Sequence, residues 1–236
     1  MFKRFLVACL FLVTACCTFN FNVDSDATQS KKPSFDVNKT YKSIGMIVGK
    51  SPDGRQMSGA GFAINKNQIM TAGHVCAGIL QYQAAGVLVN DIFMQFYAPD
   101  DETILETNGL RILKIDAKND ICLLQKDGHG LAPVKFTPNY SGMPLHTTVY
   151  IVGAPLGVFA TSFEGKTVLK DSKDMYEGMP SKLTVDAAAA PGNSGSPVFN
   201  AEGFVVGMLV AGPNGFDHVS ICTASPYLVY FINHRK

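Results

Sequence analysis

Short apolar runs recur along most of the chain, and glycine, proline and polar residues separate them. Runs of this length, rich in β-branched and aromatic residues, are typical of strands, and the turn residues between them indicate a sandwich or barrel. In the first half we expect strands at residues 43–49, 59–65, 67–71, 87–97, 111–115 and 121–125. In the second half we expect them at residues 147–153, 165–170, 182–187, 196–200, 204–210 and 218–223.

Residues 126–143 contain several glycines and prolines and are the predicted link between the two halves. After the last strand, Pro226 and the apolar stripe of residues 227–234 predict a short helix, because proline is favoured in the first helical turn. With 236 residues, of which 47% are hydrophobic, the chain is long enough for one large all-β domain or two small ones.

The first fifteen residues have the composition of an export signal that is removed from the mature protein. Lys3 and Arg4 supply positive charge, and residues 5–13 form an apolar run too short to span a bilayer. The sequence Val-Thr-Ala-Cys at residues 13–16 resembles the lipobox of bacterial lipoproteins, which predicts that Cys16 is lipidated. The alternatives are an ordinary secretory signal or a retained hydrophobic anchor.

Residues 16–39 are mostly polar and are predicted to be a flexible tether, because they cannot bury enough apolar surface to fold alone. The folded domain is then expected at residues 40–236. The alternative is that Phe35 or Val37 packs back on that domain.

A serine lies in an unusually glycine-rich stretch, DAAAAPGNSGSPVF at residues 186–199. Gly192 and Gly195 flank Ser194 and allow a sharp turn that residues with a Cβ disfavour. Such a loop exposes the serine hydroxyl and directs the N–H groups of Gly192 and Ser194 into one concavity, as an oxyanion hole requires. Ser194 is therefore a candidate nucleophile, although such a cluster alone is also typical of a surface turn.

Two distant segments supply the groups that such a nucleophile needs. His74 lies in TAGHVC, and Asp120 lies in KNDICLL just ahead of an apolar run. A hydroxyl becomes a good nucleophile when an imidazole takes its proton and a carboxylate orients that imidazole. The order His, Asp, Ser is one of the known chain orders of this triad. Asp116 is the rival candidate for the acid.

Together these motifs resemble a chymotrypsin-fold serine protease of the trypsin-like kind, close to the protease domain of the bacterial HtrA family. The resemblance extends over most of residues 42–236 and includes no PDZ domain. The motifs that carry it are GAGFAI at residues 59–64, TAGHV at 71–75, NDICLL at 119–124, VGAPLG at 152–157 and DAAAAPGNSGSPV at 186–198.

The resemblance implies an all-β fold of two six-stranded antiparallel barrels, at about residues 42–126 and 144–225, with a C-terminal helix at about 226–234. It implies that substrate pairs with residues 209–212 as an added strand. Ala188 stands where relatives that cut after basic residues carry an aspartate, which predicts an apolar specificity pocket, although Asp217 could supply a charge from the far side. The pocket residues implied are Ala188, Leu209, Val210, Ala211 and Gly212.

Charge and cysteine spacing exclude other classes. The net charge is +1, without a lysine and arginine block, so the electrostatic signature of nucleic-acid binding is missing. The cysteines lack the regular spacing of a zinc site, and we expect neither a metal nor a cofactor. An exported protein can form a disulfide among Cys76, Cys122 and Cys222, and the sequence leaves the pairing open.

The sequence thus predicts an exported, lipid-anchored serine endopeptidase that acts on proteins or peptides. The alternatives are a catalytically idle binding module with a protease fold, and an esterase-like serine hydrolase. The remaining histidines are expected at the surface or in packing rather than in catalysis; they are His129, His146, His218 and His234.

Overall fold

The structure of the protein is a computed structural model. It describes residues 35–50, 54, 56–84, 91–97, 104–128, 130–158, 161–176, 179–212 and 218–234. The predicted signal, Cys16 and most of the predicted tether therefore lie outside the described residues, as do His129 and Asp217. Among the helices that are described, none is long and apolar enough to cross a membrane.

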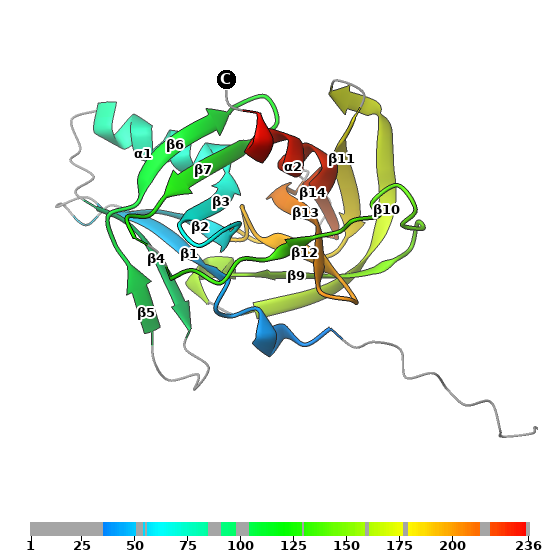
Figure 1. Ribbon diagram of the computed structural model, residues 1–236, viewed down its shortest axis with the longest axis horizontal. Coiled ribbons are helices and arrows are strands. Elements are labelled where there is room, and N and C mark those ends of the chain that lie inside the picture. The colour runs from blue at the N-terminus through cyan, green and yellow to red at the C-terminus, as the bar shows by residue number, and fades with distance from the viewer. Residues whose placement is uncertain are drawn as a thin grey trace, which may run out of the picture. The chain divides into compact units, whose positions relative to one another are not determined.

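The first sheet contains seven antiparallel strands in the order β5-β4-β1-β2-β3-β7-β6 (Figure 1). Six of them match the predicted strands, and the seventh, β5, has no counterpart among them because it is only four residues long. The strands are β1 (Ile44–Lys50), β2 (Gln56–Ala63), β3 (Gln68–Ala72), β4 (Asp91–Tyr97), β5 (Ile104–Thr107), β6 (Arg111–Asp116) and β7 (Ile121–Gln125).

The second sheet has the order β12-β9-β10-β11-β14-β13-β8, and β12 also pairs with β13. That extra pairing closes the six strands numbered β9 through β14 into an antiparallel barrel, as predicted. The two-residue strand β8 adds to β13 in parallel. The strands are β8 (Lys135–Phe136), β9 (Thr148–Gly153), β10 (Thr161–Tyr176), β11 (Met179–Asp186), β12 (Pro197–Asn200), β13 (Phe204–Ala211) and β14 (Val219–Ala224).

In the part of the chain that the structure describes, two α-helices accompany the sheets. The predicted C-terminal helix is α2 (Ser225–Asn233), whereas α1 (Gly73–Ala84) was not predicted. Gly73 and Gly78 favour a loop, but both are buried in α1 together with Val75, Cys76 and Ile79. Those three apolar residues follow the i, i+1, i+4 spacing of a helix face, which was the available signal.

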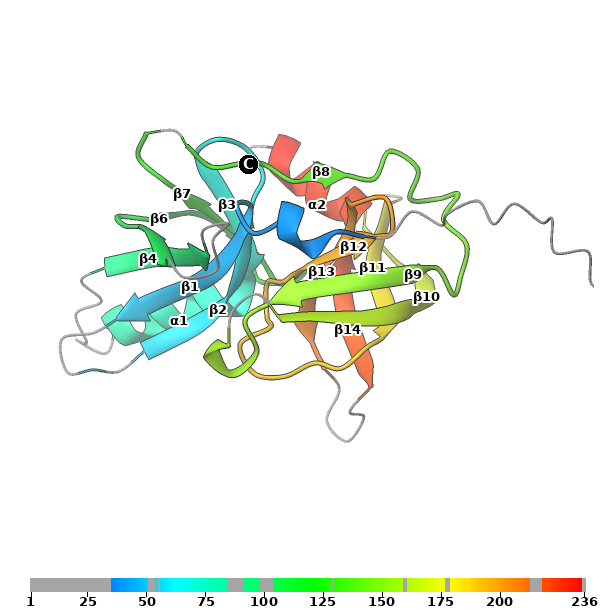
Figure 2. The same ribbon diagram turned by 90° about the horizontal axis from the view of Figure 1, so that it is seen from below.

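The apolar core consists of two clusters. One fills the second barrel, and the other joins the first sheet to residues of β12 and β13 and to α2. Tyr227, Leu228 and Phe231 of α2 belong to this joining cluster, although α2 follows the last strand of the second barrel. Figures 1 and 2 show α2 near the junction of the two sheets. Because each buried large apolar side chain contributes roughly 1.5–3 kcal/mol, α2 helps to hold the two sheets together.

The end of the predicted tether is part of the folded domain. Phe35 stacks on Tyr150 and on Phe199, with ring centroids 4.8 Å and 5.1 Å apart. A short 3-10 helix, η1 (Val37–Lys39), follows, and Val37 packs against the joining cluster. For residues 35–39 the alternative of packing on the domain is therefore correct, and the tether prediction is wrong there.

Candidate active site

His74 and Asp120 are brought together by the pairing of β3 with β7. Ala72 is opposite Ile121 in this antiparallel pair, so the residues just after β3 and just before β7 meet at one edge of the sheet. The Nδ1 of His74 lies 2.8 Å from Oδ2 of Asp120, and the backbone N–H of His74 donates to Oδ1 at 2.7 Å. One carboxylate therefore fixes both the ring and the backbone of His74.

Two local features allow this approach. A Cβ on Gly73 would lie 3.0 Å from Oδ1 of Asp120 and 2.9 Å from the backbone N of Ile121, so only glycine leaves room for the carboxylate. Asp120 itself has a positive φ of 56°, a conformation that aspartate tolerates better than most residues. Backbone conformations of this kind cluster at functional sites.

The contact also changes how both groups titrate. The hydrogen bond that His74 makes to Asp120 and the negative charge of Asp120 raise the pKa of His74 above 6.5, although partial burial opposes the change. Burial alone would raise the pKa of Asp120, but hydrogen bonds and charge from His74 outweigh it and lower the pKa, with a smaller contribution from Lys182. The two residues are thus an interacting acid and base at the protein surface.

The rival carboxylate, Asp116, is engaged elsewhere. Its Oδ2 accepts hydrogen bonds from the Tyr227 hydroxyl at 2.6 Å and from Nδ2 of Asn119 at 3.0 Å. Its Oδ1 accepts from the backbone N–H groups of Lys118 and Asn119, so Asp116 closes the turn that leads to Asp120 and ties it to α2. The structure thus separates the two candidates.

Ser194 is the second residue of the latter of two successive four-residue turns. Asn193 N–H donates to the carbonyl of Ala190, and Ser196 N–H donates to the carbonyl of Asn193. The third residue of each turn is a glycine with positive φ, Gly192 at 95° and Gly195 at 92°, as in type II turns. The predicted loop around Ser194 therefore exists, and its glycines supply conformations that other residues rarely adopt.

The same turns attach Ser194 to the first sheet. The N–H of Ala60 donates to the carbonyl of Ser194 at 2.7 Å. A Cβ on Gly195 would lie 2.1 Å from the carbonyl oxygen of Ala60 and 3.0 Å from the backbone N of Ala72, two residues before His74. The turn of the second barrel is thus packed against the segments of the first sheet that lead to His74.

A cavity of about 310 Å³ opens beside Ser194. Three of the predicted pocket residues, Leu209, Ala211 and Gly212, line it, and the others that line it are Ala189, Ala190 and Pro191. The other two predicted pocket residues lie elsewhere. Val210 belongs to the joining cluster, and Ala188 lines a second groove with Asp186 and His218.

The structure pairs Cys76 with Cys122 in a disulfide and leaves Cys222 buried as a free thiol. Burial raises the pKa of the Cys222 thiol to about 12, so it stays protonated at neutral pH. The disulfide joins the residue two positions after His74 to the residue two positions after Asp120. It therefore links the two segments that carry the acid and the base.

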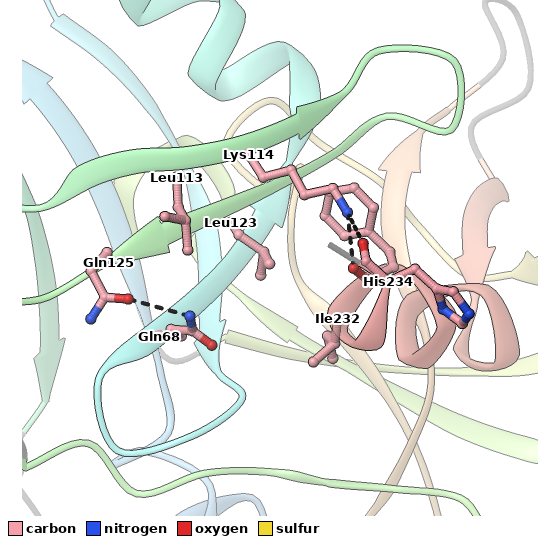
Figure 3. Close-up of a pocket in the computed structure, with 8 residues that line it drawn as sticks. Gln68, Leu113, Lys114, Leu123, Gln125, Ile232 and His234 are labelled. Carbon is pink, nitrogen blue, oxygen red and sulfur yellow. Dashed lines mark hydrogen bonds between the residues drawn. The ribbon is translucent and has the colours of Figure 1, made fainter. Parts of the chain in front are cut away.

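A second cavity, of about 420 Å³, lies between β6, β7 and the end of α2 (Figure 3). Lys114 is its main charged group, and its ammonium donates to the carbonyls of Phe231 and His234 at 3.2 Å and 2.7 Å. A cation there satisfies the last carbonyls of the helix, so Lys114 has a structural role. Within the described ranges, no group of three metal-ligating side chains is close enough to hold an ion.

Comparison with known proteins adds the family. The model of the trypsin-like peptidase domain matches residues 59–208, more than half of the chain. The chain therefore belongs to the trypsin-like peptidase family, and the expected all-β fold of two barrel-like sheets with a short C-terminal helix is confirmed.

Particular relatives lie within the HtrA group, as the resemblance implied. A Hahella chejuensis protein named "Probable periplasmic serine endoprotease DegP-like" is 29% identical over 191 residues, which are 79% of this chain and 37% of that protein. This chain thus spans less than half the length of that relative.

Solved structures show the same fold. Deg5 superposes with a TM-score of 0.64 at 21% identity, over 81% of this chain and 88% of that one. AlgW, an HtrA-type protease solved with a tripeptide, has a TM-score of 0.64 at 17% identity, over 83% of this chain and 60% of that one.

Proposed function

We propose that this protein is an exported serine endopeptidase in which Ser194 is the nucleophile, His74 the general base and Asp120 the residue that orients His74. The contact of His74 with Asp120, at the sheet edge against which the Ser194 turn packs, carries this proposal. Membership of the trypsin-like peptidase family and the names of the HtrA relatives support it.

The chemistry follows from these positions. Because Nδ1 of His74 is hydrogen bonded to Asp120, Nε2 is the nitrogen that takes the proton from the Ser194 hydroxyl. The serine oxygen then attacks the peptide carbonyl carbon, and the N–H groups of Gly192 and Ser194 hold the oxyanion. His74 returns the proton to the leaving amine, and water releases the acyl group in a second, equivalent step. No cofactor is required.

The specificity pocket is proposed to accept small and medium apolar side chains. The residues around the cavity beside Ser194 are alanine, proline, glycine and leucine apart from the serine itself, and none carries a charge. Burying an unpaired ammonium costs several kcal/mol, whereas an added methylene contributes about 0.8 kcal/mol. Cleavage of a denatured proteome would therefore yield apolar residues before the cut. A dominant lysine or arginine there would contradict this pocket and implicate Asp217.

Lipid anchoring through Cys16 is the proposed localisation, and the printed name of the Hahella relative, which includes "periplasmic", supports export. We expect Cys16→Ser to release the protein from the membrane fraction, because a lipid chain would be the strong anchor after signal removal. Cys17→Ser is the matched control and should stay in the membrane fraction. A Cys16→Ser protein that still sediments after a carbonate wash would instead favour a retained N-terminal helix.

Labelling with a fluorophosphonate tests the catalytic proposal directly. The wild-type protein should be modified at Ser194, and Ser194→Ala should not react. Ser196→Ala is the matched control, because its hydroxyl is buried without a hydrogen-bond partner among the described residues, and it should label normally. An unlabelled wild-type protein would favour the idle binding module. Hydrolysis of esters but of no peptide in a substrate panel would favour the esterase.

A further inference from the structure

Two exposed apolar side chains lie together just after β9. Leu156 and Val158 expose 76% and 64% of their surface, more than any other large apolar side chain that the structure describes. Leu156 is the middle residue of the 3-10 turn η2 (Pro155–Gly157), and Val158 follows it directly. Neighbouring exposed apolar side chains indicate a surface that contacts something else.

The backbone of Leu156 supports a functional reading. Leu156 has φ 52° and ψ 24°, a left-handed conformation that a bulky side chain rarely adopts. Such conformations persist where the surroundings impose them, and they concentrate at functional sites. A glycine or asparagine would suit this backbone better, so local stability does not explain the leucine.

The surroundings that hold Leu156 are the catalytic turn itself. The N–H of Leu156 donates to the carbonyl of Pro191 at 2.7 Å. A Cβ on Gly192 would lie 2.5 Å from the carbonyl oxygen of Ala154 and 3.1 Å from the backbone N of Leu156. The η2 turn is therefore in direct contact with the Gly192 peptide, one of the two proposed oxyanion donors.

The specificity cavity lies against other parts of the same turn. Ala189, Ala190 and Pro191 line it together with Ala211 and Gly212 at the end of β13. Gly192, in contrast, packs against η2. The part of a substrate that precedes the cleaved bond pairs with the end of β13. The part that follows the cleaved bond must therefore extend from Ser194 in another direction.

We propose that Leu156 and Val158 form a binding subsite for an apolar side chain at one of the first two residues after the cleaved bond. An extended peptide advances about 3.4 Å per residue. The first two peptide residues after the cleaved bond therefore stay within reach of the η2 turn, which contacts Gly192. The inference rests on the proposed endopeptidase function. It extends the substrate class to peptides with apolar residues on both sides of the cut.

The test compares two peptides that differ only in the two residues after the cut, Leu-Val in one and Ser-Thr in the other. The wild type should cleave the apolar peptide with a kcat/KM about tenfold higher, as expected for a partly exposed apolar contact. The variant Leu156→Asn/Val158→Thr keeps a left-handed-compatible residue and a β-branched shape but removes the apolar surface, and it should lose this preference. Leu113→Thr, at an exposed position on β6, is the control and should retain it.

Fluorophosphonate labelling separates failure of this inference from failure of the proposed function. A fluorophosphonate carries no residue after a cut, so the double variant should still be modified at Ser194 and should keep the wild-type preference before the cut, which would support a role confined to the leaving side. An unchanged preference after the cut in the double variant would overturn the subsite. A change of oligomeric state with an unchanged cleavage profile would also overturn it, because the surface would then contact a second copy. Absence of both labelling and cleavage in the wild type would overturn both proposals.

Discussion

His74 and Asp120, at the edge of the first sheet, are held through side chains, whereas Ser194 in the second barrel is held through the backbone. The imidazole and the carboxylate contact each other directly, and the Cys76–Cys122 disulfide joins the two segments that carry them. Ser194 depends instead on two glycine turns and on backbone hydrogen bonds. Its own carbonyl accepts from the Ala60 N–H, and the neighbouring residues Gly195 and Ser196 bond to Leu209.

This difference has a physical basis. An acid and base pair needs a defined distance and tautomer, which side-chain hydrogen bonds provide. An oxyanion hole needs backbone N–H groups aimed at one point, which only the conformation of the chain can provide. Side-chain substitutions should therefore disable the first region, and glycine substitutions should disable the second.

The largest effect is expected for Asp120→Asn. The amide cannot hold the required tautomer of His74, so kcat should fall by about 10³- to 10⁴-fold on a peptide substrate while the fold persists. Asp127→Asn is the matched control, because its ion pair with Arg111 is exposed at the surface and should contribute little. Similar losses in the two variants would argue against the assigned role of Asp120.

Loss of the disulfide should weaken the first region as a unit. The bond closes a loop with a sequence separation of 46, for which chain entropy predicts about 4 kcal/mol of stability. Urea unfolding of Cys76→Ser/Cys122→Ser should show most of this loss, and Cys222→Ala serves as a control that leaves the disulfide intact. A double variant as stable as the wild type would show that packing alone holds the segments.

Glycine substitution should act on the second region. Gly195→Ala introduces a Cβ 2.1 Å from the Ala60 carbonyl oxygen at a φ of 92°, so stability should fall by roughly 3 kcal/mol and labelling of Ser194 should fail. Gly203→Ala has a similar φ of 83° but no atom within 4 Å, so it should cost only about 1 kcal/mol. Equal effects would mean that backbone strain, rather than contact with the first sheet, dominates.

The smallest effect concerns pH. Since contact with Asp120 raises the pKa of His74, the acid limb of kcat/KM should have its midpoint above pH 6.5. Asp120→Asn should move that midpoint down, which a pH profile of the residual activity would measure. A midpoint at or below 6.5 in the wild type would contradict the contact.

The same shifts make stability depend on pH. The raised pKa of His74 contributes stability that is complete below pH 6.5 and is lost as the pH rises through its folded value. The lowered pKa of Asp120 contributes stability that is present above 3.8 and is lost as the pH falls through its folded value. The pair should therefore stabilise the fold most between pH 3.8 and pH 6.5.

Local patterns in the sequence determined most of the strands, the C-terminal helix and the turn around Ser194. Burial on one face of a strand imposes an apolar pattern on neighbouring residues, and a sharp turn imposes glycine, so both are visible without partners. The chain order of His74, Asp120 and Ser194 and the five motifs around them likewise predicted the family. The strand β5 and the helix α1 were missed, because a four-residue strand and a glycine-containing helix leave weak local patterns.

Only the tertiary structure decided which distant groups meet. It paired Cys76 with Cys122 rather than Cys222, gave Asp120 to His74 and Asp116 to Tyr227, and placed Ala189 rather than Ala188 at the cavity beside Ser194. Each choice depends on strand register and on turn geometry. A register shift of one residue would exchange the partners, because successive side chains of a strand face opposite sides. Residues with the same local chemistry therefore acquire different partners only when the sheets close.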